Sequence, residues 1–172
     1  MMNILYIISQ IMTIIMFFFF GLSYYLKNRK QVLIANIMAQ LFQVGATLLL
    51  KGFTGALMSL VMLLSYNTMY ADHVFKRKGS IKRSVIILAT SIFFVILITL
   101  LSYSGYASIL AAIATIIFLF GLWQKNLKRY KVYGIIGAIL WLLYYNYLKS
   151  IFGVILETML IISTIISYKK RI

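Results

Sequence analysis

Long apolar runs separated by short polar segments extend over the whole sequence. Most runs are close to the ~20 residues that a helix needs to cross a ~30 Å hydrocarbon core. Two boundaries are marked only by Lys51-Gly52 and by Lys149-Ser150. A run of about 40 residues is too long for one span, so we place a tight reversal at each lysine. The pattern predicts seven helices, at residues 3–26, 32–50, 53–71, 84–103, 106–123, 132–148 and 151–168.

The composition indicates a membrane protein. Of the 172 residues, 63% are hydrophobic and 11% are charged, so the chain has too little polar surface to cover a water-soluble domain. There is no cysteine, which excludes disulfides, thiol nucleophiles and cysteine-ligated metal sites. We therefore expect an all-α polytopic membrane protein.

Basic residues are distributed unevenly between the two ends of the predicted helices. Lys51 and Lys149 lie at one end, and the other 15 of the 17 Lys and Arg residues lie at the opposite end. The positive-inside rule then places the N-terminus outside and the C-terminus in the cytoplasm. This distribution explains the net charge of +15, so we expect no nucleic-acid partner, whereas the basic loops suit anionic lipid head groups. The clusters are Lys27, Arg29, Lys30; Lys76, Arg77, Lys78, Lys82, Arg83; Lys125, Lys128, Arg129, Lys131; and Lys169, Lys170, Arg171.

The 13 tyrosines lie mostly near the ends of the predicted helices, as Tyr24 and Tyr66 do at the cytoplasmic ends. Tyrosine favours the membrane interface because its ring is apolar and its hydroxyl is hydrated. We interpret most of these residues as an interfacial belt and reserve one or two for a binding site.

The two halves of the chain resemble each other. Residues 17–32 align with residues 117–132 at an offset of 100, and Lys51 matches Lys149 at an offset of 98. This self-similarity predicts two three-helix repeats in the same orientation, related by an axis along the membrane normal. The predicted units are repeat 1 at 1–71, a basic cytoplasmic loop with a linker helix at 72–105, and repeat 2 at 106–172.

One face of the second predicted helix is polar, and the corresponding face of the sixth is aromatic. Amides that donate and accept hydrogen bonds, opposite an aromatic wall, suit a hydroxylated or ring-shaped solute. The alternative is that the amides hydrogen-bond between helices and hold the bundle together. The polar face comprises Asn36, Gln40, Gln43 and Thr47, and its counterpart includes Trp141 and Tyr145.

Glu157 is one of two acidic residues and lies in the last apolar run, about 9 Å from the outer end of its helix. A charge at this depth costs about 2–3 kcal/mol to insert, so we expect the side chain to face the bundle interior. Its repeat counterpart is Ser59, so an ionisable group breaks the symmetry, as a directional or proton-sensitive step requires. The alternative is a structural pairing with Lys149, with Lys51 or with a tyrosine hydroxyl.

The 3+1+3 arrangement resembles the SWEET transporters and their PQ-loop relatives. In its residues the chain is more similar to the YgjV family of bacterial inner membrane proteins, which implies the bacterial cytoplasmic membrane. One departure from the SWEET pattern is the absence of proline, so alternating access would need glycine or packing shifts instead of proline hinges. The similar segment contains Trp141, Asn146, Ser150-Ile151, Gly153 and Glu157.

The residues do not assemble a catalytic or metal site. We interpret Asp72-His73 as part of a solvated loop rather than as a catalytic pair. With one His, two separated carboxylates and no Cys, neither a metal triad nor a nucleophile–base pair can form. We therefore expect no enzyme and no cofactor.

Two function classes remain. The first is a transporter or facilitator of a small polar solute, with its site between predicted helices 2, 3, 6 and 7. The second is a non-transporting membrane receptor or interaction protein on the same scaffold. The lipid bilayer is the expected environment for both, and a homo-oligomer is compatible with either. The candidate ligand-binding residues are Asn36, Gln40, Gln43, Ser59, Trp141, Tyr145, Asn146 and Glu157.

Overall fold

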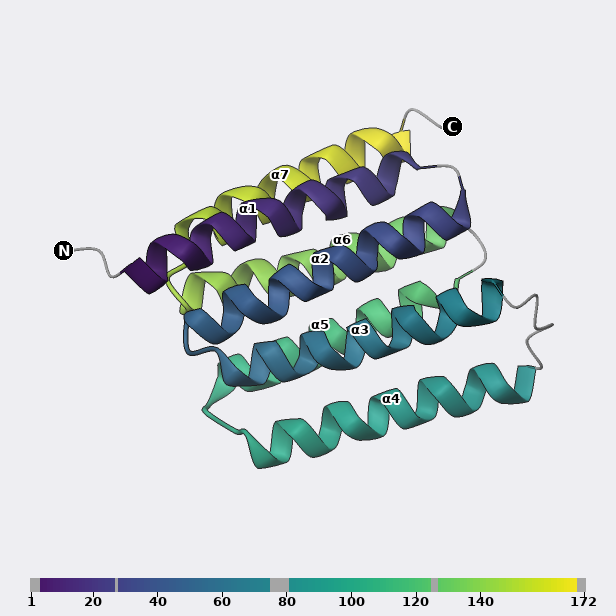
Figure 1. The fold of residues 1–172 in the computed structure, drawn as a ribbon, viewed down its shortest axis with the longest axis horizontal. Coiled ribbons are helices and arrows are strands. Elements are labelled where there is room, and N and C mark those ends of the chain that lie inside the picture. The colour runs from purple at the N-terminus through teal and green to yellow at the C-terminus, as the bar shows by residue number, and fades with distance from the viewer. Residues whose placement is uncertain (1–3, 27, 75–80, 125–126, 170–172) are drawn as a thin grey trace.

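The computed structural model describes residues 4–26, 28–74, 81–124 and 127–169, and this part of the chain contains seven α-helices and no strand. The all-α fold class is thereby confirmed. The helices lie nearly side by side with their axes aligned (Figure 1). They are α1 (Ile4–Tyr25), α2 (Arg29–Leu49), α3 (Phe53–Val74), α4 (Ile81–Leu101), α5 (Tyr106–Leu122), α6 (Leu127–Tyr147) and α7 (Ile151–Lys169).

Helices α2, α4 and α6 begin earlier than the apolar pattern predicts. α2 begins at Arg29 instead of residue 32, and α6 begins at Leu127 instead of residue 132. The side chain of Asn28 accepts a hydrogen bond from the N–H of Lys30 at 2.9 Å and so caps α2. The prediction began each of these helices where its apolar run begins. Lysine and arginine have favourable helix propensity, so the hydrogen-bonded helix continues into the basic segment.

The helices form two layers with one helix at the edge (Figure 1). α1, α2 and α3 lie side by side in one layer, and α7, α6 and α5 lie behind them in the same order. Across the layers, α1 packs against α7 and α3 packs against α5, and α4 contacts α3 and α5 at the edge. A half-turn about the long axis of the bundle exchanges these two contacts, because it carries α1 onto α5 and α3 onto α7.

The two short reversals have the same hydrogen bonds. In the first reversal, the N–H of Gly52 donates to the carbonyl of Thr47 at 2.8 Å, and the N–H of Lys51 donates to the carbonyl of Leu48 at 2.9 Å. The second reversal repeats both bonds 98 residues later, at 3.0 Å and 3.1 Å. This pair of bonds closes a helix whose next residue is left-handed, which is the conformation of both Lys51 and Lys149.

The centre of the bundle is filled by long side chains. Among the described residues, no Cα atom of α2 lies within 8 Å of a Cα atom of α6, although the two helices occupy corresponding places in the two layers. Gln40 and Gln43 of α2 and Trp141 and Tyr145 of α6 are buried in this space. The wide separation of these two helices is what leaves room for a polar site.

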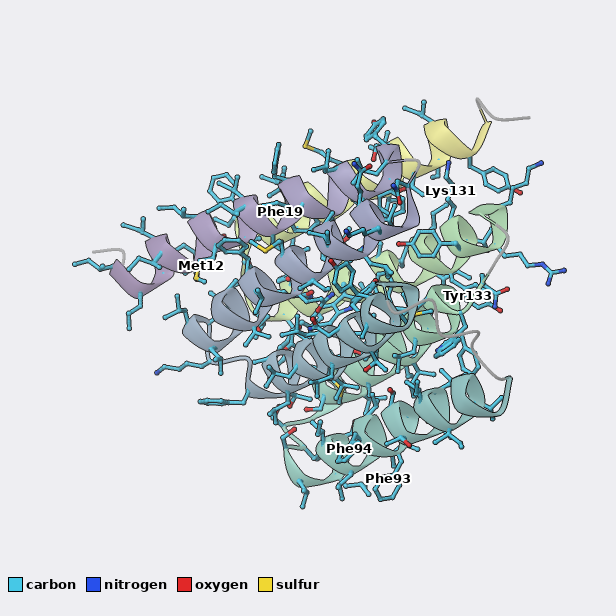
Figure 2. All side chains as sticks on the ribbon, turned by 45° about the vertical axis from the view of Figure 1, so that its right-hand side comes forward. Met12, Phe19, Phe93, Phe94, Lys131 and Tyr133 are labelled. Carbon is cyan, nitrogen blue, oxygen red and sulfur yellow. The ribbon has the colours of Figure 1, made fainter. Side chains whose placement is uncertain are left out.

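The outer surface is strongly apolar. Each of the seven helices carries large hydrophobic side chains that are exposed, such as Phe93 and Phe94 of α4 (Figure 2). Among the described residues, Ile4–Tyr25 and Lys30–Leu49 are long and apolar enough to cross a membrane, and three further apolar helices are shorter. The shorter segments are Val85–Leu101, Tyr106–Leu122 and Ile151–Ile166.

Candidate functional site

A small cavity lies at the centre of the bundle. Four of the predicted residues line it: Gln40 and Gln43 from α2, Trp141 from α6 and Glu157 from α7. Its volume is about 20 Å³, which is room for about one water molecule. The other lining residues are Phe20, Tyr24, Met62, Tyr66, Phe118 and Leu160.

The cavity contains hydrogen-bond acceptors that have no donor. Oε1 of Gln40 and Oε2 of Glu157 are buried without a partner, and Oδ1 of Asn36, one helical turn from Gln40, is in the same condition. They are the only buried side-chain nitrogen or oxygen atoms of the described residues that lack a partner. A buried acceptor without a donor costs about 1–3 kcal/mol, so a molecule that supplies donors is stabilised here.

Glu157 is buried and is not paired with an outer lysine. Its side chain is 5% exposed, whereas Lys51 and Lys149 are exposed at the reversals, and no ion pair joins either lysine to it. Its carboxyl group lies within electrostatic range of the hydroxyls of Tyr24 and Tyr145. The alternative of a lysine pairing is therefore not realised among the described residues, and Glu157 shares the cavity with the amides of Gln40 and Gln43 and with the Tyr24 hydroxyl.

Three predicted residues are buried but do not line the cavity. The amide of Asn36 donates to the carbonyl of Val32 at 2.8 Å, and the hydroxyl of Ser59 donates to the carbonyl of Gly55 at 2.8 Å. The hydroxyl of Tyr145 donates to Sδ of Met16 at 3.6 Å and also interacts with the amide of Gln43. These groups support the walls of the cavity, and none of the three residues lines it.

Asn146 does not join the candidate site. It is exposed on the last turn of α6. One residue along a helix turns the side chain by about 100°, so the position after the buried Tyr145 faces away from the centre. The prediction that included Asn146 followed the sequence motif, whereas the structure places this residue away from the central cavity. Asp72 and His73 lie in α3, and their side chains are outside the described part of the structure.

Several residues of the site were missed in the sequence. Tyr24 and Tyr66 were interpreted as interfacial, but both line the cavity. Gln10 is a buried amide in α1 whose Oε1 accepts hydrogen bonds from the hydroxyl of Ser150 at 3.3 Å and from the N–H of Phe152 at 3.2 Å. It therefore satisfies groups at the start of α7, where N–H groups have no partner within the helix. The sequence did contain a signal for Gln10, because it is a lone amide in an apolar helix.

A larger hollow opens at the end of the bundle that carries the two reversals. Its volume is about 430 Å³, and its lining includes Lys51, Thr54, Tyr103 and Tyr147. Hydroxyl groups gather here, because Thr54 Oγ1 lies 3.1 Å from the hydroxyl of Ser102 and donates to the Ser102 carbonyl at 2.9 Å. The hollow offers hydroxyl groups, aromatic rings and a cation to a solute outside the central cavity.

Tyr144 stands between this hollow and the central cavity. It lines the hollow, and its ring packs edge-on against Trp141, a cavity residue, with centroids 5.1 Å apart. Its hydroxyl accepts from the N–H of Gly55 at 3.0 Å and lies 3.4 Å from the carbonyl of Gly52. A Cβ atom on Gly55 would lie 2.7 Å from the Tyr144 ring, so only glycine allows this close approach. Trp141 and Tyr144 thus form an aromatic layer between the hollow and the central cavity.

Comparison with known proteins assigns the chain to a family. The model of Imp-YgjV, described as bacterial inner membrane protein, matches residues 7–172. The chain belongs to this family. No curated protein and no solved structure matches it at a significant level. The resemblance to the YgjV family is thereby confirmed, and so is the expected place of the protein in a bacterial inner membrane.

The site of this Imp-YgjV protein has a limited chemical repertoire. Among the described residues, no group of three or more His, Cys, Asp or Glu side chains could hold a metal ion. The cavity offers one carboxyl group, two amides, two tyrosine hydroxyls and several ring faces. Such a set binds and orients a small molecule by hydrogen bonds, charge and aromatic contact.

Proposed function

We propose that this Imp-YgjV protein is a transporter or facilitator of a small polar solute, with its central site between α2, α3, α6 and α7. The observation that carries the proposal is the small central cavity, whose lining residues Gln40 and Glu157 each have a buried acceptor atom without a donor. A bundle held together only by interhelical hydrogen bonds gains nothing from such atoms, because each one is destabilising. A transport site does gain from them, because a passing solute can donate hydrogen bonds to these atoms.

The proposed topology is seven membrane spans with the N-terminus outside and the C-terminus in the cytoplasm. The start of α1 and the end of α7 lie at opposite ends of the bundle (Figure 1), which is what an odd number of spans requires. Exposed apolar side chains on every helix suit contact with lipid. The basic segments of the sequence would then face the cytoplasm and contact anionic lipid head groups.

The proposed scaffold is a pair of three-helix repeats joined by α4, as in the SWEET and PQ-loop transporters. Two observations support it: the matching reversals at Lys51 and Lys149, and the exchange of the α1–α7 and α3–α5 contacts by a half-turn. In this arrangement the cavity lies at the boundary of the two repeats, where rocking of one repeat against the other would open it to each side in turn.

Transport is tested by reconstituting the purified protein into liposomes and following their swelling by light scattering in isosmotic solutions of small polyols, amides, amines and amino acids. We expect at least one solute to enter faster than into protein-free liposomes. Trp141→Ala should change that rate, whereas Leu143→Ala, on the exposed face of the same helix, should not. Rates equal to those of protein-free liposomes for every solute class would contradict the proposal.

The alternative proposal is a membrane receptor that binds a solute without transporting it. The observation that favours it is the difference in size between the outer hollow of about 430 Å³ and the central cavity of about 20 Å³. Saturable solute binding that depends on residues of the hollow, without entry into liposomes, would select this alternative. We assign no catalytic role under either proposal.

A further inference from the structure

We propose that the central cavity takes a small organic cation with N–H donors, that is, a protonated primary or secondary amine, held between the carboxyl group of Glu157 and the aromatic walls. This inference rests on the proposed function, because it names the solute class of the same site. The inferred solute is a cation instead of a neutral polar molecule. The inference is based on the buried acceptors, the carboxyl group and the aromatic rings of the cavity lining.

The fully buried polar atoms of the site that lack a partner are acceptors. They are Oε1 of Gln40 and Oε2 of Glu157, and both side chains are at least 95% buried. Among the described residues, no fully buried side-chain donor lacks a partner. An ammonium group brings donors alone, so each of its N–H groups can be matched to one of these acceptors.

The charge of the site also selects a cation. Glu157 is the one charged residue among those that line the cavity, and no lysine or arginine is among them. A carboxylate is expensive to hold in an apolar interior unless an opposite charge accompanies it. A ligand with one positive charge provides that partner, whereas an anion would be repelled and a neutral solute would leave the carboxylate uncompensated.

The walls are suited to an organic cation. Five of the ten lining residues are aromatic: Phe20, Tyr24, Tyr66, Phe118 and Trp141. The face of an aromatic ring attracts a cation, most strongly for Trp, and the attraction increases in a desolvated site. The repeat counterpart of Glu157 is Ser59, which does not line the cavity, so the negative charge lies on one side of the bundle.

A metal cation fits this site less well. Hard cations such as Ca²⁺ and Mg²⁺ take about six or more oxygen ligands. The cavity presents two unpaired oxygens, and no described cluster of three His, Cys, Asp or Glu residues exists. An ammonium group is satisfied by two or three acceptors and by ring faces. The cavity volume of about 20 Å³ is room for about one water molecule, so even a small amine enters only as the cavity widens.

The experiment is a binding assay with matched probes. The purified protein in lipid nanodiscs is titrated with radiolabelled ethanolamine, and ethylene glycol and choline serve as competitors. Ethylene glycol replaces the ammonium group with a hydroxyl, and choline keeps the charge but removes the N–H donors. We expect ethanolamine to bind at least about tenfold more tightly than either competitor, because charge-assisted hydrogen bonds are stronger than neutral ones.

Variants then assign the effect to the site. Glu157→Gln should weaken ethanolamine binding by about tenfold or more while leaving competition by ethylene glycol unchanged. Gln40→Met, which removes the second acceptor at similar volume, should weaken ethanolamine binding several-fold and gives a second measurement if Glu157→Gln does not fold. Asp72→Asn removes the other negative charge of the chain and is the matched control, with binding expected at the wild-type level.

The outcomes separate this inference from the proposed function. Ethylene glycol binding as tightly as ethanolamine, or ethanolamine binding unchanged in Glu157→Gln, overturns the cation site. Choline binding as tightly as ethanolamine overturns the requirement for N–H donors. If neutral solutes enter liposomes through wild-type and Glu157→Gln protein alike, the transport function is supported and the cation site is contradicted. If ethanolamine binding depends on Glu157 but no solute enters, the cation site is supported and the transport function is contradicted.

Discussion

Lys51 and Lys149, 98 residues apart, have the same left-handed backbone conformation, with φ of 59° and 55°. Among the described residues they are the non-glycine residues with positive φ. A left-handed conformation costs a residue with a Cβ atom about 1–2 kcal/mol relative to the right-handed one. Both reversals thus hold a lysine where glycine is the usual residue, which places a positive charge at the end of the bundle away from the basic loops.

This strain predicts that Lys51→Gly and Lys149→Gly stabilise the protein. We expect each to raise the free energy of unfolding by up to about 1 kcal/mol, because part of the relief is offset by the greater backbone freedom of glycine in the unfolded chain. Lys51→Val should have the opposite effect, since a β-branched residue tolerates positive φ poorly. The measurement is thermal unfolding in detergent.

The control for the reversals is Leu143→Gly, at an exposed position in the interior of α6. There glycine should lower stability by about 1 kcal/mol, because it weakens a helix interior. If Lys51→Gly were as destabilising as Leu143→Gly, the left-handed conformation would not be the strained feature that we infer.

A second prediction concerns the hydroxyl of Tyr144, which accepts a hydrogen bond from the N–H of Gly55 in the first turn of α3. Tyr144→Phe removes this acceptor and leaves a buried N–H without a partner, so we expect a loss of about 1–3 kcal/mol in unfolding free energy. In a transport assay the same change should speed solute entry, because it loosens the aromatic layer between the outer hollow and the central cavity.

Tyr147→Phe is the matched control for this hydroxyl. Tyr147 is partly exposed at the same end of α6, packs its ring on Tyr106 at 5.3 Å and has no hydrogen bond from its hydroxyl among the described residues. We expect its unfolding and its transport rate to equal those of the wild type. Equal effects of the two substitutions would mean that the Tyr144 hydroxyl has no special role in holding the aromatic layer between the outer hollow and the central cavity.

The sequence predicted the helices well and their starts less well. The periodic apolar runs and the two lysine reversals were sufficient to predict seven helices, because span length and loop charge are visible in the sequence. The start of α6 was missed by five residues. Hydropathy reports the edge of an apolar run, whereas helix ends depend on caps and on the propensity of the basic residues beyond it.

The site was predicted where polar residues interrupt an apolar face, and missed where aromatic residues complete it. Gln40, Gln43 and Glu157 are conspicuous because an amide or a carboxyl group is rare in a membrane helix. Phe20 and Phe118 line the same cavity but carry no such signal, since an aromatic residue suits lipid, core and cavity equally well. Only the packing of the two layers distinguishes these positions.

The proposed orientation predicts opposite accessibility of the two ends of α5. Single cysteines are introduced at Ser104 and Gln124 of this cysteine-free chain, and intact cells are treated with a membrane-impermeant thiol reagent. We expect Ser104→Cys to react in intact cells and Gln124→Cys to react only after the membrane is opened, because the basic segments face the cytoplasm. Reaction of both cysteines from the same side would exclude a transmembrane α5, and with it the seven-span topology.

The last prediction separates a structural role of Glu157 from a functional one. Oε2 of Glu157 has no partner to lose, so Glu157→Gln should leave the unfolding temperature within about 2 °C of the wild type, a change equivalent to less than about 1 kcal/mol. The described titratable groups around it are Tyr24 on α1, Tyr66 on α3 and Tyr145 on α6, and none of them is basic or carboxylic.

If Glu157 takes part in solute handling, a proton and the solute compete for the same carboxyl oxygen. Solute uptake by the wild type should therefore fall as the pH is lowered, and this dependence should disappear in Glu157→Gln, whose amide does not titrate. Uptake is measured in liposomes with equal pH on both sides, so that no proton gradient contributes. An unchanged pH profile in Glu157→Gln, together with a lower unfolding temperature, would return the residue to a purely structural role.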